Sequence, residues 1–241
     1  MQPHGVAKTH FGTRLARTAI TLGVLAVAGF AQPSQAPQGK EPPADQPPVG
    51  EWRRLFDGQS LKGWKETPFT ARGKVRVENG ALILGAGYMT GVSWTEWFPK
   101  SNYEVRLEAA RLEGSDFFAG ITFPVKDSYC TWINGGWGGG VVGLSSIDGQ
   151  DASENETSSF RQFERGRWYA LRLRVTDDEI VAWIDGEEAI YVALEGRTIG
   201  LRFGEIELSV PFGIATYSTT GAIRNLEYRL LPPPVQPAAD P

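Results

Sequence analysis

The stretch Trp168-Tyr169-Ala170-Leu171-Arg172-Leu173-Arg174-Val175 carries the clearest strand pattern in this chain of 241 residues. Apolar and polar side chains alternate along it with a period of two, the repeat that places successive residues on opposite faces of a strand. Leu171 and Leu173 therefore face one side, and Arg172 and Arg174 face the other. The stretch predicts a strand with one face in a core and the other in water.

Further strand and turn patterns surround this stretch. After the turn Thr176-Asp177-Asp178, an apolar run over 180–184 ends at Asp185-Gly186, a pair typical of a type I′ hairpin turn. Alternating apolar and polar residues predict another strand over 205–210. The other predicted strands cover 81–84, 103–107, 120–124, 212–217 and 223–231. Many short strands without a convincing amphipathic helix predict an all-β fold, a jelly-roll sandwich of two antiparallel sheets.

The two ends of the chain differ from this strand-rich middle. Residues 32–50 are rich in proline and poor in aliphatic side chains, which predicts an extended linker. Residues 232–241 have the same character and predict a disordered tail. The folded unit is then 51–231, which we expect to be a single β-sandwich domain and a monomer. A content of 29 Gly and 16 Pro suits a globular β protein with many turns.

Residues 1–31 have the pattern of a secretory signal peptide. Arg14 and Arg17 precede an apolar run over 19–31, which ends in the small-x-small sequence Gly29-Phe30-Ala31. The run is shorter than the roughly 20 residues that a membrane-spanning helix needs. We therefore expect a secreted or periplasmic protein with no membrane span after cleavage, and an uncleaved anchor is the alternative.

Charge and histidine content exclude several classes of function. Cleavage of the signal removes basic residues and no acids, so the mature chain is more acidic than the whole sequence with its net charge of −4. An acidic chain argues against nucleic acid as a partner, because phosphate binding needs a basic face. His4 and His10 both lie in the signal, so a mature chain without histidine excludes Ser-His-Asp and Cys-His catalysis and a His-ligated zinc. Cys130, the only cysteine, is predicted to be a small buried side chain.

A glycine-rich stretch followed by acids is the candidate functional region. The stretch is Gly135-Gly136-Trp137-Gly138-Gly139-Gly140. Glycine lets a ligand approach the backbone, so Trp137 either drops into a core or offers its face to a ligand. The predicted catalytic residues are the four acids that follow, Asp148, Asp151, Glu154 and Glu156. With Asn155 as a neutral oxygen donor, the same acids are also suited to hold Ca²⁺ or another divalent cation, and a plain solvated loop is the third interpretation.

Aromatic and amide side chains beside this region suit a sugar. A sugar ring stacks its C–H face on an aromatic side chain while a few polar groups fix its hydroxyls. Trp132, Asn134 and Trp137 are therefore the predicted substrate-binding residues, and a saccharide is the predicted ligand. Glu205 and Glu207, placed on one face of the predicted strand, form a second candidate acid–base pair. Their alternative is a solvated outer face.

Three segments resemble the secreted family of 3-keto-disaccharide hydrolases. They are the opening motif over 55–64 (LFDGQSLKGW), the pair 102–108 and 119–123, and the group 166–169, 183–186 and 212–215. The family's fold is similar to the concanavalin-like lectin and laminarinase sandwich. The chain departs from the family in one place, because it has no Glu-x-Gln between 120 and 160.

The resemblance implies a secreted hydrolase or lyase that acts on glycosides. In this hypothesis the loop of Trp137 closes over a saccharide, and the acids of 148–156 supply the acid–base chemistry. Two alternatives stay open. One is a glycan-binding module without catalysis, and the other is an extracellular interaction domain of the laminin-G type.

Overall fold

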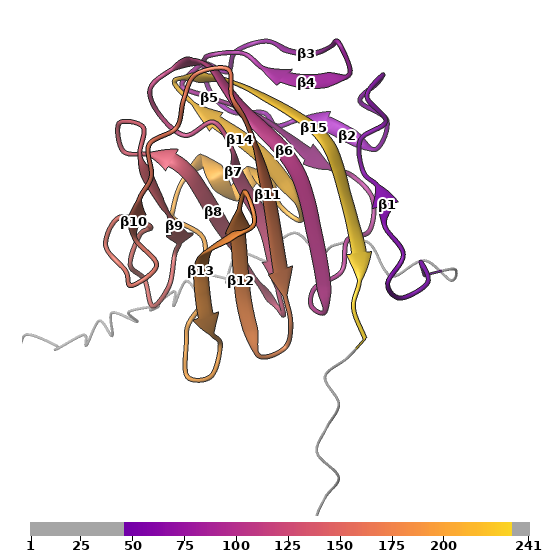
Figure 1. Ribbon diagram of the computed structural model, residues 1–241, viewed down its shortest axis with the longest axis vertical. Helices are drawn as coiled ribbons and strands as arrows, with labels where there is room; N and C mark the ends of the chain where they lie inside the picture. The colour runs from indigo at the N-terminus through magenta and orange to yellow at the C-terminus, as the bar shows by residue number, and fades with distance from the viewer. Residues whose placement is uncertain (1–45, 233–241) are drawn as a thin grey trace, which may run out of the picture. The chain divides into compact units, whose positions relative to one another are not determined.

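The computed structural model describes residues 46–232, which form two antiparallel β-sheets (Figure 1). The predicted signal over 1–31, most of the linker over 32–50 and the tail from 233 lie outside the described residues. Within the described part of the chain, no helix is long and apolar enough to cross a membrane. The predicted jelly-roll sandwich of two antiparallel sheets is confirmed.

The first sheet is built around the stretch that opened the sequence analysis. Its strands follow in the order β13 (Glu187–Ala193), β12 (Glu179–Ile184), β11 (Trp168–Val175), β6 (Tyr103–Gly114), β15 (Thr219–Leu230), β4 (Ala81–Leu84) and β3 (Val75–Glu78), with β1 (Arg53–Arg54) also paired to β15. In β11, Leu171 and Leu173 are buried and pair with Leu107 and Val105 of β6. The predicted alternation therefore sets the register of the sheet.

The second sheet carries the glycine-rich stretch. Its strands follow in the order β10 (Ser159–Phe160), β9 (Val141–Ser145), β8 (Ser128–Gly136), β7 (Gly120–Val125), β14 (Gly213–Tyr217), β5 (Met89–Trp94) and β2 (Trp64–Glu66). Strand β14 lies between β7 and β5, which are far from it in sequence. Such long-range antiparallel pairing is typical of jelly-roll topology. In Figure 1, β11, β6 and β15 lie in front of β8, β7 and β14.

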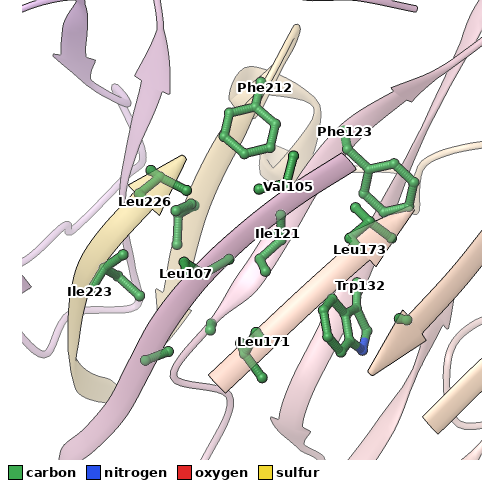
Figure 2. Close-up of a cluster of buried hydrophobic side chains, with 14 of the residues drawn as sticks. Val105, Leu107, Ile121, Phe123, Trp132, Leu171, Leu173, Phe212, Ile223 and Leu226 are labelled. Atoms are coloured by element: carbon green, nitrogen blue, oxygen red, sulfur yellow. The ribbon is translucent and has the colours of Figure 1, made fainter. Parts of the chain in front are cut away.

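The inward faces of the two sheets form one hydrophobic core. Figure 2 shows Val105 and Leu107 of β6 and Leu171 of β11 in the same cluster as Ile121 of β7 and Trp132 of β8. All of these side chains are almost completely buried. Trp132 is the largest of them, so the second sheet contributes its bulkiest side chain to the core.

The prediction of a strand over 205–210 is wrong, because the segment contains the 3₁₀-helix η1 (Glu205–Ser209). Its buried residues are Ile206 and Ser209, three positions apart, which is the repeat of a 3₁₀-helix. Ile206 packs with Phe69 and Met89 on the outer face of the second sheet. The alternation of apolar and acidic residues in this segment therefore does not come from a strand.

The two tryptophans of the β8–β9 region should differ in their effect on stability. Trp132 is fully buried, whereas 44% of Trp137 is exposed. We expect Trp132→Ala to lower the free energy of unfolding by about 3–5 kcal/mol, because it removes a large core side chain and leaves a cavity. Trp137→Ala should lower it by less than about 1 kcal/mol. Denaturation in urea measures both, and equal losses would contradict this placement of Trp132.

The buried thiol of Cys130 should make stability depend on alkaline pH. Burial raises the pKa of this thiol from 9.0 to about 12. Between these values the unfolded chain releases a proton that the folded chain keeps, so the unfolded state binds fewer protons and stability falls as pH rises.

We expect the free energy of unfolding to fall more steeply between pH 9 and about 12 in the wild type than in Cys130→Val. Burial also raises the pKa of Tyr103, and Cys130 raises it further, so the part due to burial is common to both proteins and the part due to Cys130 acts in the same direction as the thiol itself. The measurement is a series of urea titrations across this pH range. Parallel curves for the two proteins would show that the thiol titrates alike in the folded and unfolded states.

Candidate functional site

The glycine-rich stretch ends β8 and forms its connection to β9, and it holds Trp137 out of the core. Trp137 has a left-handed backbone with φ of 48°, and its indole is exposed. Gly138 N–H is bonded to the carboxylate of Asp116 at 3.2 Å, and Gly139 and Gly140 both donate to the carbonyl of Gly136. Of the two orientations that the sequence left open, the structure has the one in which Trp137 offers its face to solvent.

Trp137 stands at the edge of a groove on the outer face of the second sheet. The groove has a volume of about 890 Å³. Alternation along β8 supplies part of its floor, because Cys130 and Trp132 point into the core while Thr131 and Ile133 line the groove. The rest of the floor comes from the ends of the neighbouring strands, namely Ser145 of β9, Tyr217 of β14 and Met89 of β5.

Aromatic side chains line much of this groove. They are Tyr88, Phe117, Trp137, Phe203 and Tyr217. The ring of Tyr217 lies 5.0 Å from that of Tyr88 and 5.9 Å from that of Phe117, measured between centroids. Phe203, in the loop just before the 3₁₀-helix η1, is 94% exposed. Flat apolar faces in an open groove suit a ligand that has a flat, partly apolar face of its own.

An ion pair between Asp151 and Arg202 is the main charged feature of the groove. Asp151 Oδ2 lies 2.7 Å from Arg202 Nη1, and its Oδ1 accepts hydrogen bonds from Ser145 Oγ at 2.5 Å and from the Ala152 N–H at 2.8 Å. The guanidinium of Arg202 lies 5.8 Å from the centroid of the Trp137 ring. The pair therefore places a carboxylate and a cation beside the exposed indole.

Glu205 and Tyr217 are among the other polar residues that line the groove. Both carboxylate oxygens of Glu205, at the start of η1, accept from the backbone N–H of Thr70 at 3.0 and 3.1 Å. Burial raises the pKa of the Tyr217 phenol, and the neighbouring Tyr88 raises it further. Tyr217 is therefore a neutral hydrogen-bond donor at physiological pH.

Two of the seven predicted site residues, Asp151 and Trp137, line the groove. Asp148 and Glu156 instead pair with Arg197, and Asp148 also accepts from the Thr198 N–H at 2.7 Å. Glu154 is exposed on the same loop and does not line the groove. Arg197 and Arg202 therefore divide the acidic segment into an outer part and a part that faces the groove.

The predicted binding residues Trp132 and Asn134 lie elsewhere. Trp132 belongs to the core, and Asn134 is fully buried, where it donates to the Ala119 carbonyl at 3.0 Å. The predicted pair of Glu205 and Glu207 is not formed on a strand face, since both residues belong to η1 and only Glu205 lines the groove.

Sequence reasoning missed several groove residues, and their signals differ in strength. Thr131 and Ile133 flank Trp132, so the period of two places them on the opposite face once Trp132 is known to be buried. Arg202 and Tyr217 had no comparable signal, because they reach the groove only through long-range packing.

The acids of the 148–156 segment do not fit a metal ion. No group of three His, Cys, Asp or Glu side chains within residues 46–232 is arranged to hold one. Asp148, Asp151 and Glu156 face arginine side chains instead. The calcium interpretation is therefore not supported by these residues.

A second hollow, of about 820 Å³, lies on the outer face of the first sheet. Its charges pair with one another, as in the contact of Arg106 with Glu227 at 2.6 Å. The guanidinium of Arg172 covers the ring of Trp183 at 3.9 Å. The aromatic face of this hollow is therefore already covered by an arginine. The groove of the second sheet is the better candidate site.

Comparisons with solved structures relate the chain to other sandwich proteins. The Crh5 transglycosylase in complex with NAG is 12% identical, with a TM-score of 0.52 over 77% of this chain and 86% of that one. A structure from work on endo-acting O-glycanases of the human gut microbiota is 14% identical, with a TM-score of 0.50 over 76% of this chain and 100% of that one. At these identities the likeness shows the fold alone.

A putative glycosyl hydrolase from Parabacteroides distasonis is 13% identical, with a TM-score of 0.49 over 75% of this chain and 94% of that one. No curated protein sequence matches the chain. The family comparison is more specific, because one family matches residues 51–227, nearly the whole of the described fold. The chain belongs to the family of 3-keto-alpha-glucoside-1,2-lyase-like domains.

Proposed function

We propose that the protein binds a saccharide in the groove of the second sheet and cleaves it, with Asp151 as the acid–base residue. The observation that carries this proposal is the exposed indole of Trp137 beside the ion pair of Asp151 and Arg202. Family membership and the carbohydrate-related fold neighbours support it. The predicted signal peptide supports an action outside the cytoplasm, and we propose that the protein acts as a monomer.

Binding rests on the aromatic lining of the groove. A pyranose ring has an apolar C–H face that stacks on an indole, and its hydroxyls need hydrogen-bond partners at the ring edge. Trp137 supplies the flat face, while Ser145, Asp151 and Arg202 supply polar atoms beside it. This arrangement suits a single sugar ring better than a wholly apolar ligand.

The family's reaction class needs only one base, and Asp151 is the carboxylate of the groove that we assign to this role. In a 3-keto glycoside the carbonyl acidifies the hydrogen on C2, so one base can start the cleavage. The proton moves from C2 to Asp151, the C2–H electron pair forms the C1=C2 double bond, and the C1–O bond breaks. The departing oxygen takes a proton from Tyr217 or from water. The alternative, hydrolysis by two carboxylates, needs a second carboxyl group as well, with the acid and the base about 5–9.5 Å apart across the sugar.

The arginine has a defined part in this scheme. Arg202 is 61% exposed in its side chain, so it has room to exchange Asp151 for a substrate oxygen. Its positive charge then stabilises the negative charge that develops on the carbonyl oxygen as C2 loses its proton. Release of the ion pair also frees an oxygen of Asp151 to accept that proton.

A glycan-binding module without catalysis is the second candidate function. Both oxygens of Asp151 are engaged in the unliganded groove. The middle of β8 also presents Thr131 and Ile133, neither of which can act as an acid or base. Aromatic stacking beside neutral hydrogen-bonding groups is sufficient for binding alone.

The first experiment separates catalysis from binding in the full chain. Methyl 3-keto-α-glucoside and methyl α-glucoside are incubated with the protein while methanol release is followed. We expect turnover of the keto sugar. Asp151→Asn should lower kcat by at least about 100-fold, because the base is removed. Trp137→Ala should raise KM roughly tenfold, equal to about 1.4 kcal/mol of lost stacking.

Arg197→Met is the matched control, because it removes an arginine that pairs with acids outside the groove. It should leave kcat and KM unchanged although it lowers stability. Binding of both sugars without turnover, abolished in Trp137→Ala, would favour the binding module. Binding that is unchanged in Trp137→Ala would refute the site itself.

The ion pair in the groove should also respond to substitution of its cation. We expect Arg202→Met to lower kcat for the keto sugar by about tenfold or more, since the developing negative charge loses its partner. Arg202→Lys should retain part of the activity because it keeps the charge. Steady-state kinetics of the two variants measure this, and equal activities of Arg202→Met and the wild type would contradict the role given to Arg202.

A further inference from the structure

Arg111 of β6 is a buried cation for which the proposed chemistry has no use. Only 7% of the residue is exposed. Its Nη2 donates to the carbonyl oxygens of Gly139 at 2.7 Å and Gly135 at 3.3 Å, and its Nε has no partner. Its guanidinium lies 5.4 Å from the centroid of the Phe118 ring. Arg111 forms no ion pair with any carboxylate in the described part of the chain.

This arrangement costs stability. Burial lowers the pKa of Arg111, which reflects the loss of water around its charge, although Asp116 and Tyr169 act in the opposite direction. A buried charge without a direct carboxylate partner is destabilising compared with an apolar side chain of similar volume. The contacts of Arg111 therefore point to a role other than packing.

The contacts of Arg111 converge on the loop that carries Trp137. The carbonyls of Gly135 and Gly139 lie on the two sides of Trp137 in sequence, and both accept from the same nitrogen. From the other direction, Asp116 accepts from the Gly138 N–H at 3.2 Å. Trp137 itself has φ of 48°, a conformation that a residue with a bulky side chain rarely adopts. The loop is therefore held in an unfavourable conformation by polar contacts from both sides.

The glycines of this loop leave the space that the guanidinium fills. A Cβ atom on Gly135 would lie 2.3 Å from Arg111 Nη2, and one on Gly139 would lie 3.2 Å from Nη1. Both glycines also have positive φ, at 81° and 120°. The glycine-rich sequence and the buried arginine thus depend on each other.

We propose that Arg111 is a positioning residue that fixes the 135–139 loop with the indole of Trp137 at the edge of the groove before the saccharide arrives. The inference rests on the proposed function, since it assumes that Trp137 contacts the sugar. A loop that is ordered in advance does not lose its conformational freedom on binding, so affinity is higher than for a mobile loop. Arg111 contacts the loop from the first sheet and does not line the groove.

The test is a double-mutant cycle in the full chain with methyl α-glucoside and methyl 3-keto-α-glucoside as the probes. We expect Arg111→Met to weaken binding of the sugar that the wild type binds by about tenfold, the effect of ordering roughly one residue's backbone. In the Trp137→Ala background the same substitution should change affinity less than twofold, because Arg111 acts only through Trp137. Arg111→Lys should fall between, since it retains one donor group for one carbonyl.

The matched control is Arg174→Met. Arg174 lies on β11 and also has a buried Nε without a partner, but its guanidinium pairs with Glu179 and does not contact the loop. Its removal should leave affinity unchanged. A loss of affinity from Arg111→Met that persists in the Trp137→Ala background would overturn the proposal, since the effect would then be a general loss of structure.

Hydrogen exchange without a sugar gives an independent measurement. The N–H groups of Gly139 and Gly140 both donate to the Gly136 carbonyl. Arg111→Met should speed their exchange at least tenfold while exchange in β11 stays unchanged, and Arg111→Lys is used if the methionine variant does not fold. Unchanged exchange in these glycines overturns the inference. Faster exchange together with a Trp137→Ala variant that binds normally would overturn the proposed function and leave the positioning of the loop standing.

Discussion

The alternation of side chains along β8 is the constraint on which both the core and the groove depend. A strand directs successive residues to opposite faces, so Trp132 enters the core while Thr131 and Ile133 face the groove. A shift of register by one residue would exchange these faces, moving the largest core side chain into the groove. Pairing of β8 with both β7 and β9 fixes that register, with Trp132 opposite Ile121 on one side and Leu144 on the other.

The groove is the part of the second sheet that the covering loops leave open. Where loops cross the sheet, two of its outward positions are glycines. A Cβ on Gly91 would lie 2.9 Å from the Phe69 ring, and one on Gly213 would meet Ser209. These glycines allow Phe69 and η1 to pack directly on the sheet, whereas Thr131, Ile133 and Tyr217 remain under the opening. The sheet thus has two packed faces, and only part of the outer one is free for a ligand.

The fold could be predicted further from the sequence than the site could. Period-two alternation is a local signal, and it was sufficient for β11 and its neighbours. The same signal failed at 205–210, where the residues form a 3₁₀-helix that buries Ile206 and Ser209 on one side. For the site, the glycines around Trp137 drew attention to this residue but left its burial open, and adjacency in sequence did not separate Trp137 from Trp132. The sorting of the acids depends on Arg197 and Arg202, which lie some 40–50 residues from them in sequence, so no local pattern contains it.

Ion pairing explains why one acid of the segment faces the groove while its neighbours do not. Arg197 pairs with both Asp148 and Glu156, so two carboxylates share one cation outside the groove. Asp151 instead accepts a hydrogen bond from Ser145. Ser145 is the last residue of β9, and its side chain points to the outer face of the sheet. Its cation, Arg202, is the more exposed partner, with 61% of its side chain exposed against 16% for Asp151. A carboxylate fixed by the sheet and an exposed guanidinium form an asymmetric pair. In the reaction that we propose, the base keeps its place while the cation exchanges it for the substrate.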